Sequence, residues 1–457
     1  MTAKTNWGAR FFHPELGLMA QRAADAVADQ GPVRVGALDG KWWVYAGGVW
    51  RPDERAIRRR VVALLGERYR GPHSSNIQDV LRATVDEMPV EPVTAVINVP
   101  NGLLHWRAPG GPVLVDHDPD ALSTVQLPVR WNPDARCPAF DAFLSAAVAE
   151  DDLQRVWEVI GYLVMSGNPL QRMFLLNGPG GNGKGVLLGV LSALLGAANT
   201  VAVPLHSFVN NRFAPARLFG KLANICGDIP AAFIEDTAKI KELAGQDRID
   251  AEEKGRDPFT FEFWGKSIFS CNGLPGSADG STGWTRRWEI ISFPNAPARP
   301  DRGLRDRLST PAELEGILVK AVAALGTLMD RGDFVRGEAA QEVHRDFAMR
   351  SNKLLSWIDD EMIYHPSGFY PRADLLKWFR WWDASANPSS KAIGLQAFYD
   401  KMRQLDGVRE VKIQGVRGFR GLMRKVDAHE VTPDENCPQN APDAPGAFLD
   451  DPSELLI

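Results

Sequence analysis

The sequence is poor in cysteine and has no long apolar run, and these two absences exclude several classes of protein. It has no CxxC pair, because its four cysteines lie far apart, which argues against a zinc site and against a disulfide framework. The cysteines are Cys137, Cys226, Cys271 and Cys437. No run of about 18 apolar residues exists, so we predict no membrane span. The N-terminus lacks the apolar core of a secretory signal, and we therefore expect the chain to stay in the cytoplasm.

An excess of positive charge is also missing, since the net charge at neutral pH is −5. The acids are concentrated in the tail, residues 427–457, which holds eight acids and no Lys or Arg. Without those eight negative charges, the net charge of −5 becomes +3. The preceding segment, 405–426, holds six Lys or Arg against two acids. We expect the Pro- and Asp-rich tail to be disordered, and the overall charge neither supports nor excludes a nucleic-acid partner.

The length of 457 residues suggests about three domains, and 44% apolar with 24% charged residues is typical of a globular protein. Aromatic runs around Gly47-Gly48 predict a β-hairpin, and a second β-rich stretch turns at Asn101-Gly102. Apolar spacing of three and four residues predicts helices from Phe140 onward. We divide the chain into an N-terminal α+β module (1–135), a helical collar or linker (136–169), an α/β ATPase core (170–335), a winged-helix domain (345–426) and the acidic tail (427–457).

The strongest local signal is a glycine-rich segment between an apolar strand and an apolar helix. Met173-Phe-Leu-Leu-Asn is followed by Gly-x4-Gly-Lys, which is the Walker A pattern of a phosphate-binding loop. Glycines allow backbone N–H groups to surround phosphates, and the helix N-terminus adds its positive dipole end. The predicted nucleotide-binding residues are Gly178, Pro179, Gly180, Gly181, Asn182, Gly183, Lys184, Gly185 and Val186, with Lys184 as the point charge.

One position departs from the pattern. Gly185 occupies the place where a Ser or Thr hydroxyl normally contacts Mg²⁺. Either water replaces that hydroxyl, or the metal depends on a carboxylate elsewhere. The departure concerns metal binding more than phosphate binding, and ATP with Mg²⁺ remains the predicted ligand pair.

Two further strands end in polar residues that suit an ATPase. The apolar strand from Leu222 ends at Asp228, the candidate carboxylate for Mg²⁺ and for orienting the attacking water. No second acid adjoins it, so either Asp228 serves both roles or Glu235 contributes. The strand from Lys266 ends at Asn272, whose amide is a candidate sensor of the γ-phosphate, although Asn at a strand end is often only a turn former.

A loop after Asn272 ends in Arg286 and Arg287, and a new strand follows from Trp288. Two arginines near a nucleotide site suggest an arginine finger, which supplies positive charge to the transition state, often from the next subunit. A surface salt-bridge pair is the alternative.

The C-terminal segment combines helices with a short β pair around Gly415. Helices followed by a two-stranded wing predict a winged helix, with Lys391, Arg417 and Arg420 as candidate DNA contacts. We expect the tryptophans of 378–382 to belong to the core rather than to stack on bases, and the helix from Lys391 to bury Leu395.

Four elements now stand in order: Gly178 to Gly185, Asp228, Asn272 and Arg286-Arg287. This order, with Ala216-Arg-Leu-Phe-Gly-Lys, Cys271-Asn-Gly-Leu-Pro and Pro128-Val-Arg-Trp-Asn-Pro, resembles superfamily 3 helicases over roughly residues 40–426. It looks most like phage and plasmid DNA primase-helicases and the poxvirus-type helicase-primases. The resemblance implies a modified AAA+ core, a hexameric ring and ATP bound between subunits.

The resemblance also implies a hairpin that grips DNA in the ring channel, here within 245–263 with Lys254 and Arg256 at its tip. A solvent-exposed charged turn is the alternative. We expect an ATP-dependent DNA helicase of a phage, plasmid or prophage, acting on single-stranded or forked DNA in a bacterial cytoplasm. Because few residues precede the first hairpin, we expect no primase domain, with any primase or polymerase supplied as a partner. The alternatives are an origin initiator or loader and a nucleotide-gated DNA-binding protein.

Overall fold

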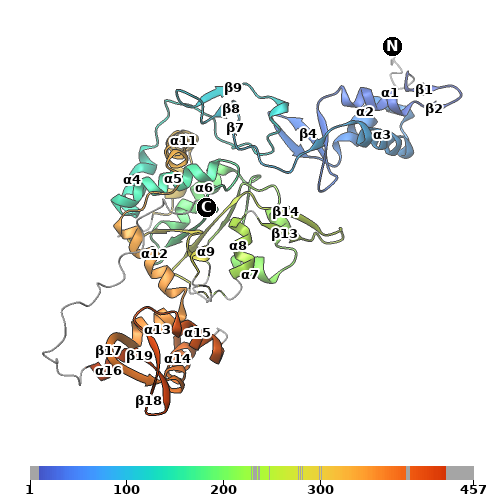
Figure 1. The fold of residues 1–457 in the computed structure, drawn as a ribbon. Coiled ribbons are helices and arrows are strands. Elements are labelled where there is room, and N and C mark those ends of the chain that lie inside the picture. The colour runs from blue at the N-terminus through green and yellow to red at the C-terminus, as the bar shows by residue number, and fades with distance from the viewer. Residues whose placement is uncertain are drawn as a thin grey trace. The chain divides into compact units, whose positions relative to one another are not determined.

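The structure is a computed structural model that describes residues 10–227, 229, 234, 237–245, 247–275, 277, 279, 281–297, 299, 301–386 and 392–428. The chain divides into two compact units, Met1–Lys353 and Leu354–Ile457, each with its own core (Figure 1). The domain boundaries predicted at residues 135, 169 and 335 all fall inside the first unit. Asp228, Glu235, Lys391 and the tail from residue 429 lie outside the described residues.

The first unit begins with three helices packed beside a small sheet of order β5-β4-β3-β6. The predicted hairpin is present, with Gly47 and Gly48 at positive φ between its two strands. Trp42, Ile57 and Leu81 belong to the core of this part. The elements are β1 (Phe12–His13), β2 (Gly17–Leu18), α1 (Ala20–Ala28), β3 (Val33–Gly36), β4 (Trp42–Ala46), β5 (Val49–Pro52), α2 (Ala56–Leu65), α3 (Gly71–Thr84) and β6 (Glu87–Met88).

A second antiparallel sheet and two helices follow, and they share one core with the later part of the unit. Phe140 of α4 and Leu104 of β8 lie in the same hydrophobic cluster as Leu325 of the long helix α11. Gly161 allows α5 to approach α11, because a Cβ there would lie 2.2 Å from the carbonyl oxygen of Ala321. Residues of 136–169 therefore share a hydrophobic core with the rest of the unit. The elements are β7 (Ile97–Val99), β8 (Gly102–His105), β9 (Val113–Val115), α4 (Pro138–Ala147), α5 (Leu153–Val164) and α11 (Pro311–Arg331).

The centre of the unit is a five-stranded parallel sheet of order β11-β12-β15-β10-β16. Side chains of β10 alternate between its two faces, as a strand requires. Phe174 and Leu176 pack with α4, α5, α6 and α11, whereas Met173 and Leu175 pack with α7, α8 and a hairpin. The sheet is therefore covered on both sides, which explains its almost continuously apolar strands. The strands are β10 (Met173–Asn177), β11 (Thr200–Val201), β12 (Ala223–Cys226), β15 (Lys266–Cys271) and β16 (Trp288–Ser292).

An antiparallel hairpin lies between β12 and β15 in the sequence, within the predicted range 245–263. The strands β12 and β15 themselves pair directly in the sheet. Lys254 and Arg256 are exposed in its turn, around Gly255 at positive φ. None of the helices in the described parts of the chain is long and apolar enough to cross a membrane. The remaining elements are α6 (Lys184–Leu195), α7 (Leu205–Asn210), α8 (Thr237–Gly245), β13 (Arg248–Ala251), β14 (Phe259–Glu262), α9 (Thr282–Thr285), α10 (Leu304–Leu308) and α12 (Glu338–Arg350).

The second unit packs three helices on a three-stranded antiparallel sheet of order β17-β19-β18. One expectation was wrong here, because Leu395 is exposed at the start of its helix, and the strand formed by residues 362–371 was not predicted. The predicted β pair around Gly415 is present as β18 and β19. The elements are α13 (Lys353–Glu361), β17 (Met362–Pro371), α14 (Arg372–Ala386), α15 (Leu395–Arg403), β18 (Arg409–Ile413), β19 (Val416–Arg424) and α16 (Lys425–Ala428).

Candidate nucleotide site

The glycine-rich loop lies at the carboxyl end of β10, the strand between β15 and β16. Gly178, Gly181 and Gly183 all have positive φ values, between 78° and 155°, which favour glycine. Gly178 also needs the space, because a Cβ there would lie 2.3 Å from the carbonyl oxygen of Phe293. Helix α6 starts at once after the loop, and no side chain caps its N-terminus. Its first N–H groups therefore face the space where an anion would bind.

Lys184 is held inside the loop by three oxygen atoms. Its Nζ donates to the carbonyl of Gly178 at 2.6 Å, the carbonyl of Pro179 at 3.0 Å and Oδ1 of Asn182 at 3.0 Å. Asn182 in turn donates through Nδ2 to the carbonyl of Phe293, just beyond β16. The amide of Asn182 thus joins the loop to the neighbouring strand and orients the lysine. The sequence pattern named Asn182 but did not reveal this role.

A cavity of about 1120 Å³ opens beside the loop. Residues 180–186 line it, and so do Ser270 and Asn272 at the carboxyl end of β15. The predicted sensor Asn272 and Lys184 therefore face one space. Gly227, the residue before Asp228, also lines the cavity.

Cys271 lies beside this cavity but does not act as a nucleophile there. Its Sγ contacts Oδ1 of Asn177 at 3.5 Å. Burial raises the pKa of the Cys271 thiol to about 11, so the thiol stays protonated at neutral pH.

Three arginines on the far wall of the cavity were missed by the sequence analysis: Arg302, Arg305 and Arg307. Arg307 forms an ion pair with Asp301, and Arg305 forms one with Asp306 at 3.5 Å. Arg302 is exposed, and no carboxylate among the described residues pairs with it. The arginines of 299–307 are visible in the sequence, but no sequence pattern indicates that this segment lines the cavity beside the glycine loop.

Arg286 and Arg287 lie at the opposite edge of the sheet. They precede β16, whose first residue, Trp288, pairs with Met173 at the start of β10. The glycine loop follows the end of β10, so the two sites are separated by the length of the strand, roughly 15 Å. The structure therefore does not bring either arginine to the loop of its own chain.

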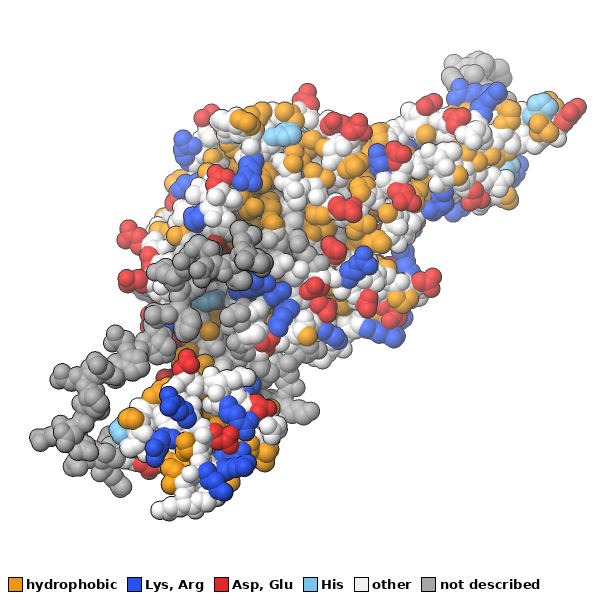
Figure 2. All heavy atoms as spheres, in the orientation of Figure 1, with side chains coloured by type: hydrophobic (Ala, Val, Ile, Leu, Met, Phe, Trp, Pro, Cys, Tyr) orange, Lys and Arg blue, Asp and Glu red, His pale blue; other side chains and the backbone are white. Residues whose placement is uncertain are grey.

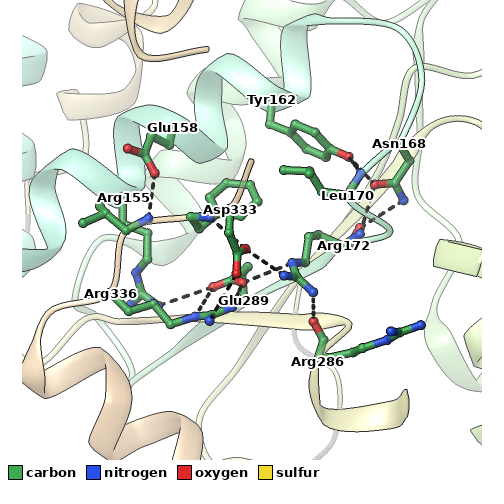
Figure 3. Close-up of polar contacts among 12 residues, drawn as sticks. Arg155, Glu158, Tyr162, Asn168, Leu170, Arg172, Arg286, Glu289, Asp333 and Arg336 are labelled. Carbon is green, nitrogen blue, oxygen red and sulfur yellow. Dashed lines mark hydrogen bonds and ion pairs between the residues drawn. The ribbon is translucent and has the colours of Figure 1, made fainter. Parts of the chain in front are cut away.

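The two arginines also differ from each other. The Nη1 of Arg287 donates to the carbonyl of Gly283, and burial lowers the pKa of this guanidinium. Arg286 is exposed, and its side chain has no hydrogen bond or ion pair with a described residue. Its main-chain carbonyl accepts a hydrogen bond from Arg172 (Figure 3). Of these two arginines, Arg286 is therefore the one whose guanidinium is available to a ligand.

A buried ionic network fixes the backbone at this edge. Glu289 of β16 has no exposed surface and pairs with Arg155 at 3.7 Å, Arg172 at 3.3 Å and Arg336. Arg172 also pairs with Asp333 at 2.7 Å (Figure 3). Since Arg172 holds both Glu289 and the Arg286 carbonyl, the network restrains the segment that presents Arg286.

A solved structure resembles this fold at low sequence identity. The A form apo structure of the NrS-1 C terminal region is 11% identical, with a TM-score of 0.50, covering 87% of this chain and 98% of its own. A second structure, of NrS-1 C terminal region 305–718, is 11% identical with a TM-score of 0.48, covering 88% and 99%. Identity this low shows the fold alone, and the second likeness adds no argument.

Two family models match parts of the chain. Residues 20–148 match the family described as D5 N terminal like. Residues 176–287, which contain the glycine loop and both candidate finger arginines, match a family of unknown function, DUF5906. The D5 N terminal like match thus covers the upstream part of the chain, and the structural likeness concerns the fold.

Proposed function

We propose that this chain is an ATP-dependent DNA helicase of a phage, plasmid or prophage replication system, working as a hexameric ring. The observation that carries the proposal is the glycine loop at the end of β10, with Lys184 and Asn272 facing one cavity. The D5 N terminal like match upstream supports the replication context.

The described residues fit the phosphates of a nucleotide. The loop combines left-handed glycines, an uncapped helix N-terminus and a buried ammonium, which together recognise phosphate through N–H groups and charge. Lys184 donates to two loop carbonyls and to the Asn182 amide oxygen, and phosphate oxygens are acceptors of the kind that could take their place. Asn272 would hydrogen-bond the attacking water or the γ-phosphate from the neighbouring strand end.

The fit to Mg²⁺ rests on fewer residues. Gly185 offers no hydroxyl, whereas the buried Ser270 lines the cavity and offers one. We assign the metal-holding carboxylate to Asp228, whose neighbour Gly227 lines the same cavity. When bound, Mg²⁺ would neutralise charge on the phosphates.

Position and availability favour Arg286 over Arg287 as the finger. Arg286 is exposed at the edge of the sheet opposite the glycine loop of its own chain. A finger that acts on the nucleotide of the next subunit must lie away from its own nucleotide site in this way. This geometry supports a head-to-tail ring with nucleotide between subunits.

The proposed DNA contacts have unequal support. At the hairpin tip, Arg256 pairs with Glu253 at 3.2 Å, which leaves Lys254 as the exposed cation with no partner among described residues. On the second unit, Arg420 lies directly opposite Arg409 in the strand register. Like charges in this arrangement repel each other, and a phosphate between them would remove that cost. Arg417 and Arg420 are three residues apart on one strand, so they face opposite sides and would not contact one phosphate together.

The decisive measurement is the ATP turnover rate with and without single-stranded DNA, for wild type, Lys184→Ala and the control Lys320→Ala. Lys320 forms an exposed ion pair with Asp141, and neither side chain lines the cavity beside the loop. We expect DNA-stimulated turnover that Lys184→Ala abolishes and Lys320→Ala retains. Binding of ATP without turnover would favour a nucleotide-gated binder, and turnover without unwinding of a long fork would favour an initiator or loader.

A further inference from the structure

Helix α14 exposes a tryptophan near two cations. The side chain of Trp381 is 71% exposed, the most exposed large aromatic side chain among the described residues. Lys377 is exposed four residues before Trp381 and so lies beside it on the helix surface, and Arg380, the residue before Trp381, is exposed as well. An exposed aromatic ring beside cations brings together the two kinds of group that bind single-stranded nucleic acid.

The other two tryptophans of α14 have clear structural roles. Trp378 packs edge-on against Tyr370, with ring centroids 5.1 Å apart, and lies under the guanidinium of Arg424. Trp382 is buried and donates through Nε1 to Asp360 at 2.8 Å. The expectation that the tryptophans of this segment are core residues therefore holds for Trp382 and, in part, for Trp378. It is wrong for Trp381, whose exposure packing does not explain.

We infer that this face of α14 binds single-stranded DNA, with Trp381 stacking on an unpaired base and Lys377 and Arg380 contacting neighbouring phosphates. Base stacking on an aromatic ring and cationic contacts to the backbone are the two elements of single-strand binding. The inference rests on the proposed action on DNA and names the surface of the second unit that carries it.

Charge favours a nucleic acid as the occupant of this face. Neither Lys377 nor Arg380 pairs with a carboxylate among the described residues, and Arg380 has only a long hydrogen bond of 3.5 Å to the carbonyl of Ile393. On α15, by contrast, Arg403 is neutralised by Asp400 at 2.6 Å and Glu410 at 2.8 Å. Lys and Arg side chains also gather on the face of the second unit seen in Figure 2.

The test compares binding of a labelled oligo(dT) to full-length wild type, Trp381→Ala, Trp381→Phe and Leu395→Ala, by fluorescence anisotropy. Leu395 is an exposed apolar residue of α15 and serves as the matched control. Loss of one stacked base should weaken binding about tenfold to hundredfold for Trp381→Ala, with Trp381→Phe retaining most of the affinity. Leu395→Ala and binding to duplex DNA should be unchanged.

The cations should leave a different signature. Removing Lys377 and Arg380 together should lower the slope of log K against log salt by about 1.4, since each phosphate contact on a single strand contributes roughly 0.7. Trp381→Ala should leave that slope unchanged, because stacking releases no counterions.

The inference is overturned if Trp381→Ala binds oligo(dT) with wild-type affinity. If that variant also changes the sedimentation of the assembly, the face is a protein contact instead. Failure of the proposed function looks different. In that case wild type itself would not bind oligo(dT), or DNA would not stimulate its ATP turnover. Equal melting temperatures of the variants and wild type verify that the exposed substitution leaves the fold intact.

Discussion

Replacing Glu289 by glutamine should destabilise the first unit more than any exposed charge substitution. The carboxylate is fully buried and compensates three guanidinium groups, those of Arg155, Arg172 and Arg336. Glutamine keeps the shape but removes the charge, so the arginines are left partly uncompensated. Removing one partner of a buried ionic group costs about 3–5 kcal/mol.

This cost converts into a measurable shift of the melting temperature. The unfolding entropy is about 2.1 cal/mol/K per residue, or about 0.7 kcal/mol/K for a unit the size of Met1–Lys353. The expected decrease in melting temperature is therefore about 4–7 °C. Scanning calorimetry of the full chain measures it, and urea unfolding at 25 °C gives the free energy independently.

Asp330→Asn is the matched control for Glu289→Gln. Asp330 pairs with Arg107 at 3.0 Å, but the two side chains are 74% and 56% exposed. Such a pair contributes at most about 1 kcal/mol. A melting temperature of Glu289→Gln within 1.5 °C of that of Asp330→Asn, roughly the shift for 1 kcal/mol, would show that the Glu289 network does not stabilise the first unit by the predicted amount.

Three other substitutions test the packing and the buried charges. Burial, with Arg336 and other arginines nearby, lowers the pKa of His344 to about 4, so the folded ring stays neutral while the unfolded ring takes up a proton below pH 6.5. Stability should therefore fall as pH decreases from 6.5 towards 4, and His344→Gln should remove that part of the fall in urea titrations at several pH values. Gly161→Ala should cost about 1–3 kcal/mol, because its methyl group would meet the backbone of α11, and an unchanged melting temperature would contradict this contact. Lys266 is fully buried, and burial lowers the pKa of its amine well below the usual value. The Lys266→Met variant should therefore be at least as stable as wild type at pH 7. Wild type should gain stability as pH rises towards 10.5, and the variant should not show this gain.

Much of the fold could be predicted because local pattern and final structure agree. The segment from Met173 to Leu195 carries its own signals: an apolar strand, glycines where φ is positive, and an apolar helix. Helices α4 and α5 lie where apolar spacing predicts helices from Phe140 onward. The strand at 362–371 was missed because Pro366 and Gly368 interrupt its pattern. The structure accommodates both in a register irregularity between His365 and Phe369.

The site was predictable in part for the same reason. Loop residues are contiguous, so their spacing reveals them, and Asn272 follows an adjacent strand. The partners of Glu289 come from α5, the start of β10 and the segment after α11, and no local pattern relates them. Likewise, helical periodicity predicted Leu395 as a buried residue. It lies in the first turn of α15, where its side chain is exposed to solvent.

The placement of the glycine loop and Arg286 on opposite edges of the sheet has a genetic consequence under the proposed function. Each chain would contribute half of two different catalytic centres, one through Lys184 and one through Arg286. Mixing a Lys184→Ala chain with an Arg286→Ala chain would then restore intact centres at some junctions, although each variant alone is inactive. A chain carrying both changes would instead inactivate two centres in every ring that it enters. It would therefore act as a dominant inhibitor at low dose.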